Sequence, residues 1–147
     1  MTPDPFNLER FVTAQQGVYE RVLGELRAGR KSGHWIWFIF PQLAGLGRSE
    51  TSRFYAIASV EEARMYLTHP VLGPRLLACV DAVQATPSGA SATDIFGSLD
   101  ALKVQSSMTM FHRAAPDEPR FREILERFYR GLPDAATDAL LSAVDGA

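Results

Sequence analysis

Apolar residues recur at helical spacing through most of the chain. Between residues 8 and 28 they fall mostly three, four or six positions apart, which is the spacing of one helix face. These residues are Leu8, Phe11, Val12, Val18, Val22 and Leu26. Asn7 and Gly29 are residue types that favour the start and the end of a helix. The pattern predicts one amphipathic helix over residues 8–28.

Similar signals predict helices along the rest of the chain. Ser59 followed by Glu62 has the pattern of a capping box and places a helix over residues 60–68. Caps and apolar stripes of the same kind predict further helices. Their approximate ranges are 70–85, 91–97, 100–111, 117–131 and 134–144.

Residues 35–40 are six consecutive large apolar residues, so they have no polar face. Periodicity cannot separate a buried strand from a buried helical turn in so short a run. No second strand is evident to pair with it, which favours a short buried helix ended by Pro41. Together the elements predict an all-α fold, a compact single-domain orthogonal bundle of six to eight helices over residues 4–144.

Length and composition place the chain among single soluble domains. It has 147 residues, of which 46% are hydrophobic, and no apolar run approaches the roughly 18 residues that a membrane helix needs. The single cysteine, Cys79, excludes an internal disulfide and a multi-cysteine zinc site. Residues 1–6 do not have the pattern of a signal peptide. We therefore expect a cytoplasmic protein without membrane association.

Charge is unevenly distributed along the chain. The formal net charge of −2 argues against a dedicated nucleic-acid binder. Residues 1–58 carry a net charge of +2 and residues 59–147 carry −4. The basic part contains the aromatic run, in which four of the chain's fifteen aromatic residues fall.

The first group of candidate binding residues surrounds this aromatic run. Aromatic planes can stack on a flat ring, an amide can hydrogen-bond its edge, and Arg or Lys can hold a phosphate. The residues are His34, Trp35, Trp37, Gln42 and Arg48, flanked by Arg30 and Lys31. The alternative interpretation is that the aromatic run is core and that the cations are its solvated border.

The second group is a polar set on the helix predicted over residues 100–111. It consists of Asp100, Lys103, Ser106, Ser107 and Thr109. Lys103 and Ser107 are four residues apart and hence neighbours on a helix, an arrangement that a Ser–Lys hydrolase could use. An exposed helix face gives the same pattern, and a lone lysine among small hydroxyls also suits an anionic ligand.

No metal site or cofactor is expected. The three histidines, His34, His69 and His112, match no compact metal-ligand spacing. The chain also has no nucleophile elbow, phosphate-binding loop or dinucleotide-binding glycine motif.

Several sequence blocks together resemble one known family. They include Asp4-Pro5-Phe6, His34-Trp35, Pro41-Gln42-Leu43, Gly45-Leu46-Gly47, Tyr55-Ala56-Ile57, Ile95-Phe96-Gly97 and Ser106-Ser107-Met108-Thr109. The chain closely resembles the family catalogued as domain of unknown function 1810 over about residues 4–141. The resemblance implies a compact all-α domain and little about activity. Some members have been labelled calpastatin, a long disordered protease inhibitor, which a chain this apolar does not resemble.

These residues lead to a functional hypothesis. We expect an anionic, nucleotide-like small molecule to bind between residues 34–48 and the helix over residues 100–109. The ligand-binding candidates are Trp35, Trp37, Gln42, Arg48, Ser106, Ser107 and Thr109, and the catalytic candidates are His34, Asp100 and Lys103. For an enzyme, the reaction class is hydrolysis of a glycosidic or ester bond, with Asp100 or His34 as the acid or base.

The alternative is a non-catalytic module whose aromatic patch docks a partner protein or a second copy of the chain. The sequence leaves open whether the protein is an enzyme, and what its oligomeric state is.

Overall fold

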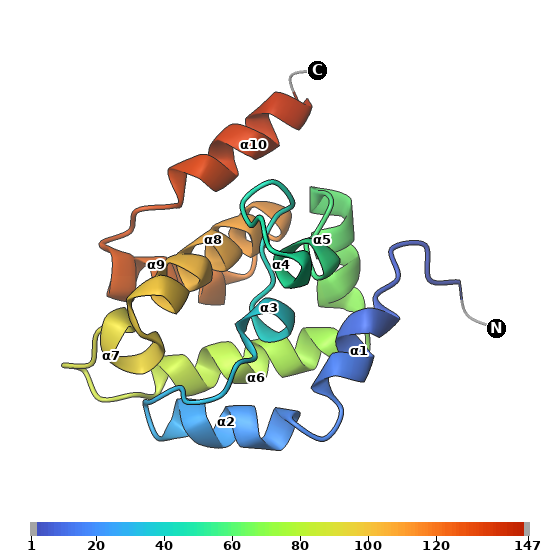
Figure 1. Ribbon diagram of the computed structural model, residues 1–147. Coiled ribbons are helices and arrows are strands. Elements are labelled where there is room, and N and C mark those ends of the chain that lie inside the picture. The colour runs from blue at the N-terminus through green and yellow to red at the C-terminus, as the bar shows by residue number, and fades with distance from the viewer. Residues whose placement is uncertain (1–2, 146–147) are drawn as a thin grey trace.

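The computed structural model describes residues 3–145 and consists of α-helices joined by short loops (Figure 1). The helices are α1 (Glu9–Gln15), α2 (Tyr19–Arg27), α3 (Ile36–Ile39), α4 (Glu50–Phe54), α5 (Val60–Thr68), α6 (Leu72–Gln84), α7 (Ala92–Phe96), α8 (Ser98–Ala114), α9 (Pro119–Tyr129) and α10 (Ala135–Asp145). The all-α prediction is confirmed, with ten helices in the described part of the chain instead of six to eight.

The helix count differs for two reasons. The single helix predicted over residues 8–28 is divided into α1 and α2, because Gln16 is extended and Gly17 adopts a positive φ of 76°. In addition, the five-residue helix α4 was missed. Its only marker in the sequence is Ser49, whose side chain accepts a hydrogen bond from the Ser52 N–H.

The start of α1 also differs from the prediction. Asn7 does not cap this helix and has a positive φ of 53°. Instead, the Asp4 carboxylate accepts hydrogen bonds from the N–H groups of Leu8 and Glu9, at 2.7 and 3.0 Å. These contacts hold the pKa of Asp4 below its ordinary value. A carboxylate satisfies free N–H groups and favours the positive end of the helix dipole.

Other predicted local features are present. The run at residues 35–40 contains the short helix α3, with Ile36 and Ile39 buried. Gly29 has a φ of 73° directly after α2, as expected for a glycine that ends a helix. Ser59 caps α5 by accepting a hydrogen bond from the Glu62 N–H.

Helix α8 lies at the centre of the molecule (Figure 1) and packs against α3, α5, α7, α9 and α10. Aromatic rings cross the core beside it. The ring centroids of Tyr66 and Phe111 are 5.4 Å apart, and those of Phe111 and Phe121 are 5.5 Å apart. Phe11 extends this row to α1, with its centroid 5.1 Å from that of Tyr66. Four helices therefore share one aromatic core.

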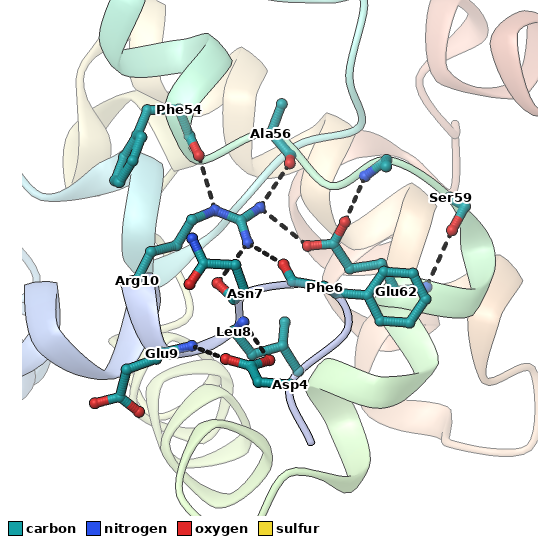
Figure 2. Close-up of polar contacts among 11 residues, drawn as sticks. Asp4, Phe6, Asn7, Leu8, Glu9, Arg10, Phe54, Ala56, Ser59 and Glu62 are labelled. Atoms are coloured by element: carbon teal, nitrogen blue, oxygen red, sulfur yellow. Dashed lines mark hydrogen bonds and ion pairs between the residues drawn. The ribbon is translucent and has the colours of Figure 1, made fainter. Parts of the chain in front are cut away.

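A buried ion pair joins the start of α1 to the first turn of α5 (Figure 2). An Arg10 Nη2 N–H donates to Glu62 Oε2 at 3.0 Å, and the two side chains are only 9% and 3% exposed. The other four N–H groups of the guanidinium donate to backbone carbonyls at 2.7–2.9 Å. These carbonyls belong to Phe6, Asn7, Phe54 and Ala56.

Glu62 extends the network through its second oxygen, Oε1, which accepts from the Ala58 N–H at 2.8 Å. The segment from Phe54 to Ala58 is thus bound by Arg10 on its carbonyls and by Glu62 on an N–H. This segment also forms the parallel bridge between Ile57 and Leu43. The network therefore fixes an irregular stretch of backbone that neither a helix nor a sheet holds.

We predict that Arg10→Met lowers the free energy of unfolding by about 3–5 kcal/mol, because it leaves the Glu62 carboxylate buried without its partner. Urea unfolding of the wild type and the variant measures this difference. The double variant Arg10→Met/Glu62→Leu is expected to recover part of the loss, since it removes the uncompensated charge. A loss below about 1 kcal/mol for Arg10→Met would contradict a structural role for the network.

Candidate functional site

A cluster of three charged side chains joins the loop after α2 to the first turn of α8. The Asp100 carboxylate lies between two ammonium groups, with Lys31 Nζ 2.8 Å from Oδ2 and Lys103 Nζ 3.1 Å from Oδ1. The Lys31 side chain is 8% exposed, whereas that of Lys103 is 30% exposed. Of the two lysines, Lys103 is the one that a ligand can reach more easily.

The loop that carries Lys31 is fixed by hydrogen bonds. The Lys31 N–H donates to the Ile95 carbonyl at 2.7 Å. Glu25 Oε1 accepts from the N–H groups of Ser32 and Gly33 and from Trp35 Nε1, at 2.7–2.9 Å. Burial raises the pKa of Glu25, but these hydrogen bonds outweigh it and keep the pKa below its ordinary value. An ionised carboxylate thus organises the loop.

The electrostatics of the cluster favour an ionised Asp100. Partial burial raises the pKa of Asp100, but hydrogen bonds and positive charge from Lys31 and Lys103 outweigh it and lower the pKa below its ordinary value. With both lysines protonated, the cluster has a net charge of +1. A carboxylate held in this way serves as a counterion and is poorly suited to act as a general acid near neutral pH.

Trp37 links this cluster to a hollow on the surface. Lys103 Nζ lies 5.3 Å from the centroid of the Trp37 ring, within the range of a cation–π contact. Trp37 also lines an open hollow of about 570 Å³. The other lining residues are His34, Phe38, Glu50, Thr51, Phe54 and Tyr55.

Aromatic side chains form much of the wall of this hollow. The ring centroids of Phe54 and Tyr55 are 4.7 Å apart, and those of Phe38 and Tyr55 are 5.6 Å apart. Phe54 is 55% exposed. Arg10 donates a hydrogen bond to the backbone carbonyl of Phe54. The buried ion pair described above therefore holds the backbone of this wall in place.

The structure brings together four of the candidate residues. Asp100 and Lys103 form an ion pair, Lys103 contacts the ring of Trp37, and His34 lines the same hollow as Trp37. Lys31, which the sequence marked only as a flanking cation, completes the charged cluster. Glu50, Thr51, Phe54 and Tyr55 were not among the candidates, because the helix that carries the first three was not predicted.

The other aromatic candidate lies elsewhere. Trp35 is 1% exposed and donates its ring N–H to Glu25, so its side chain belongs to the core. Arg48 is exposed and Gln42 is half-buried. Within residues 3–145, neither of these two side chains forms a hydrogen bond or ion pair with the cluster.

The hydroxyl candidates on α8 are all buried. Ser106 donates to the Leu102 carbonyl, and Thr109 donates to the Gln105 carbonyl and accepts from the Asp134 N–H. Ser107 is 0% exposed, and its hydroxyl has no hydrogen-bond partner in the described part of the chain. Ser107 and Lys103 therefore do not form a hydrogen-bonded pair, and these hydroxyls do not face the hollow.

The two other histidines, His69 and His112, do not line the hollow. His69 Nδ1 accepts from the N–H groups of Val71 and Leu72 at the start of α6. Burial lowers the pKa of His112, whose Nδ1 is enclosed. Over residues 3–145, no three His, Cys, Asp or Glu side chains are grouped in a way that could hold a metal ion.

None of the described helices is long and apolar enough to span a membrane.

Comparisons with known proteins place the chain in one family. The model for the family described as "Protein of unknown function (DUF1810)" matches residues 5–141. The crystal structure of the conserved hypothetical protein Rv1873 from Mycobacterium tuberculosis is 52% identical in sequence, with a TM-score of 0.92. The match covers 95% of this chain and 99% of that one. No curated protein sequence matches the chain.

Asp100→Asn tests the charged cluster through its pH dependence. Because the folded pKa of Asp100 lies below its ordinary value of 3.8, ionised Asp100 stabilises the fold above about pH 4, and this contribution is lost as the pH falls through the folded pKa. At pH 7 the variant should lose about 1–3 kcal/mol of unfolding free energy, and the difference from wild type should shrink towards pH 2.

Urea unfolding at the two pH values measures this difference. The control is Asp117→Asn, which alters an exposed carboxylate that forms no ion pair within the described residues. A difference for Asp100→Asn that stays constant with pH would contradict the assigned role of the carboxylate.

Proposed function

The chain belongs to the DUF1810 family, and we propose that it binds a small molecule in which a flat ring carries an anionic group, as in a nucleotide. The observation that supports this proposal is the position of Trp37, whose ring contacts Lys103 and also lines the hollow that contains His34. Suitable groups for both halves of such a ligand thus lie beside one indole.

The hollow suits the ring of the ligand. Its volume of about 570 Å³ lies within the usual range for small-molecule sites. Trp37, Tyr55 and Phe54 offer aromatic surface, and stacking of a base on an aromatic side chain contributes about 1–3 kcal/mol. Thr51 and Glu50 supply polar groups that can hydrogen-bond the edge of a ring.

Lys103 suits the anionic group. Its ammonium has three N–H donors, and the structure uses one of them for Asp100. Asp100 and the ring of Trp37 hold the ammonium in place before a ligand arrives, which reduces the entropy lost on binding. Lys31, which is more deeply buried, holds the other oxygen of Asp100 and keeps the cluster positive.

We extend the proposal to hydrolysis of a glycosidic or ester bond through one residue, His34. It is exposed and lines the hollow, and an imidazole can accept a proton from an attacking water near neutral pH. Asp100 is less suited to this role, because both its oxygens are paired with lysines.

A protein-interaction module is the second candidate, and exposed leucines favour it. Leu99 and Leu102 are 75% and 61% exposed and flank Asp100 and Lys103 along α8. Apolar side chains exposed in this way are typical of docking surfaces. This candidate predicts that the leucines, and not Lys103, determine what the protein binds.

Titration with AMP, ADP-ribose and NAD⁺ tests the binding proposal. A ligand stacked on Trp37 should quench its fluorescence, while the buried Trp35 remains as an internal reference. Because the ligand binds only the native state, it should also raise the melting temperature. Lys103→Met is expected to weaken binding about tenfold, a loss of about 1.4 kcal/mol, whereas Lys103→Arg retains the charge and should bind more tightly than Lys103→Met.

The control variant is Leu99→Ser/Leu102→Ser, which should leave nucleotide binding unchanged. Trp37→Phe keeps an aromatic ring but removes the reporter, so its binding is followed by calorimetry. If none of the three compounds changes the fluorescence or the melting temperature at millimolar concentration, and the leucine variant alone changes the oligomeric state in light scattering, the interaction module replaces the nucleotide proposal. Incubation with ADP-ribose and the His34→Ala variant tests hydrolysis separately.

A further inference from the structure

A second candidate site lies between α10 and the start of α5. In Figure 1, α10 lies at the edge of the molecule, away from α2 and α6, and it packs mainly against α8. Leu140 of α10 reaches the loop before α4, where a Cβ added to Gly45 would lie 3.3 Å from Leu140 Cδ1. The space below α10 contains two adjoining cavities.

The two cavities differ in character and share part of their walls. The smaller cavity, of about 160 Å³, is lined mainly by apolar residues. These are Leu43, Ala44, Ala58, Val60, Leu140 and Leu141. The larger cavity, of about 560 Å³, contains the charged side chains of Glu61, Arg64, Arg113 and Asp138. Val60, Glu61 and Leu141 line both cavities, so Glu61 lies where the apolar part meets the polar part.

Two of the four charged groups neutralise each other. Arg113 Nε and Nη2 donate to the two oxygens of Asp138, each at 2.9 Å. This hydrogen-bonded pairing keeps the pKa of Asp138 below its ordinary value. A bidentate pair of this kind leaves little net charge for a ligand. Arg64 and Glu61 therefore determine which ligand charges the cavity favours.

Arg64 and Glu61 are available to a ligand. Arg64 Nε donates to the Ala114 carbonyl at 3.0 Å, which fixes the guanidinium while its two terminal nitrogens form no hydrogen bond in the described part of the chain. Glu61 lies one turn earlier on α5 and forms no ion pair with Arg64 or with another described cation. The larger cavity thus offers the positive charge of Arg64, and the negative charge of Glu61 lies where it meets the apolar cavity.

We propose that this crevice binds a free α-amino acid with an apolar side chain. The carboxylate of the ligand pairs with Arg64, its ammonium group pairs with Glu61, and its side chain enters the smaller cavity. A cavity of about 160 Å³ is similar in size to cavities that hold a benzene ring. It therefore fits a side chain such as that of leucine or phenylalanine.

The charge arrangement selects a zwitterion over simpler ions. A fatty acid or another apolar anion would bring its carboxylate close to Glu61, and an apolar amine would bring its ammonium close to Arg64. A ligand with both charges gives each protein group an opposite charge and brings neither group close to a like charge. The position of Glu61 at the junction matches the α-carbon of an amino acid, from which the side chain and the charged groups diverge.

Calorimetric titration of the full chain with L-leucine, L-leucinamide and N-acetyl-L-leucine tests this proposal. Leucinamide lacks the carboxylate and N-acetyl-leucine lacks the ammonium, so each should bind at least about tenfold more weakly than leucine. L-Alanine should also bind more weakly, because it leaves the smaller cavity unfilled. Equal affinities for leucine and N-acetyl-leucine, or no binding of leucine at about 10 mM, would overturn the proposal.

Variants locate the site and separate it from the nucleotide proposal. Glu61→Gln should lose the preference for leucine over N-acetyl-leucine, and Arg64→Gln should lose the preference for leucine over leucinamide. Glu61 is exposed and unpaired within the described residues, so Glu61→Gln should keep the wild-type melting temperature. Arg64→Gln loses the hydrogen bond to the Ala114 carbonyl and should lower the melting temperature slightly. Lys103→Met is the matched control and should bind leucine as the wild type does. If Lys103→Met weakens leucine binding and Glu61→Gln does not, leucine binds at the other site and the crevice proposal is wrong.

Discussion

The arrangement of the candidate sites depends on one buried ion pair. Arg10 uses all five guanidinium N–H groups within the protein, one on Glu62 and four on backbone carbonyls. Backbone outside helices and sheets needs other partners for its polar groups when it is buried. The segment at residues 54–58 obtains them from the side chains of Arg10 and Glu62. In the sequence, Arg10 is distant from this segment and Glu62 is close to it. The same segment contributes to both sites, because Phe54 and Tyr55 line the hollow of Trp37 and Ala58 lines the crevice below α10.

The sequence predicts the features that depend on neighbouring residues. The amphipathic helices, the cap at Ser59 and the end of α2 at Gly29 follow from local spacing and residue type. The i,i+3 pair of Asp100 and Lys103 is also local, although the sequence alone marks its two residues only as members of one polar set. The pairing of Lys31 with Asp100 is different, because it joins distant parts of the chain and depends on how α8 packs against the loop after α2.

The buried hydroxyls of α8 show why part of the candidate site could not be predicted. A helix with one apolar face exposes its polar residues on the opposite side. Both interpretations of Ser106, Ser107 and Thr109, a ligand site and a solvated helix face, require exposed hydroxyls. Helix α8, however, has other helices on several sides, so small polar residues are enclosed with the apolar ones. Ser106 and Thr109 satisfy their hydroxyls on the preceding turn. The two tryptophans also differ in position, with Trp35 buried in the core and Trp37 lining the hollow. Residues two positions apart on a helical turn point in different directions.

Thr109 gives α10 an uneven attachment to the rest of the fold. Its hydroxyl accepts from the Asp134 N–H, and Asp134 in turn caps the first turn of α10 by accepting from Thr137. Beyond this anchored end, the contacts of α10 over the described residues include the Arg113–Asp138 pair and the packing of Leu140 and Leu141. Elements with few tertiary contacts open at a lower free energy than the core. Amide protons of α10 should therefore exchange with solvent through a local opening about its first turn, while those of α8 exchange only when the whole domain unfolds.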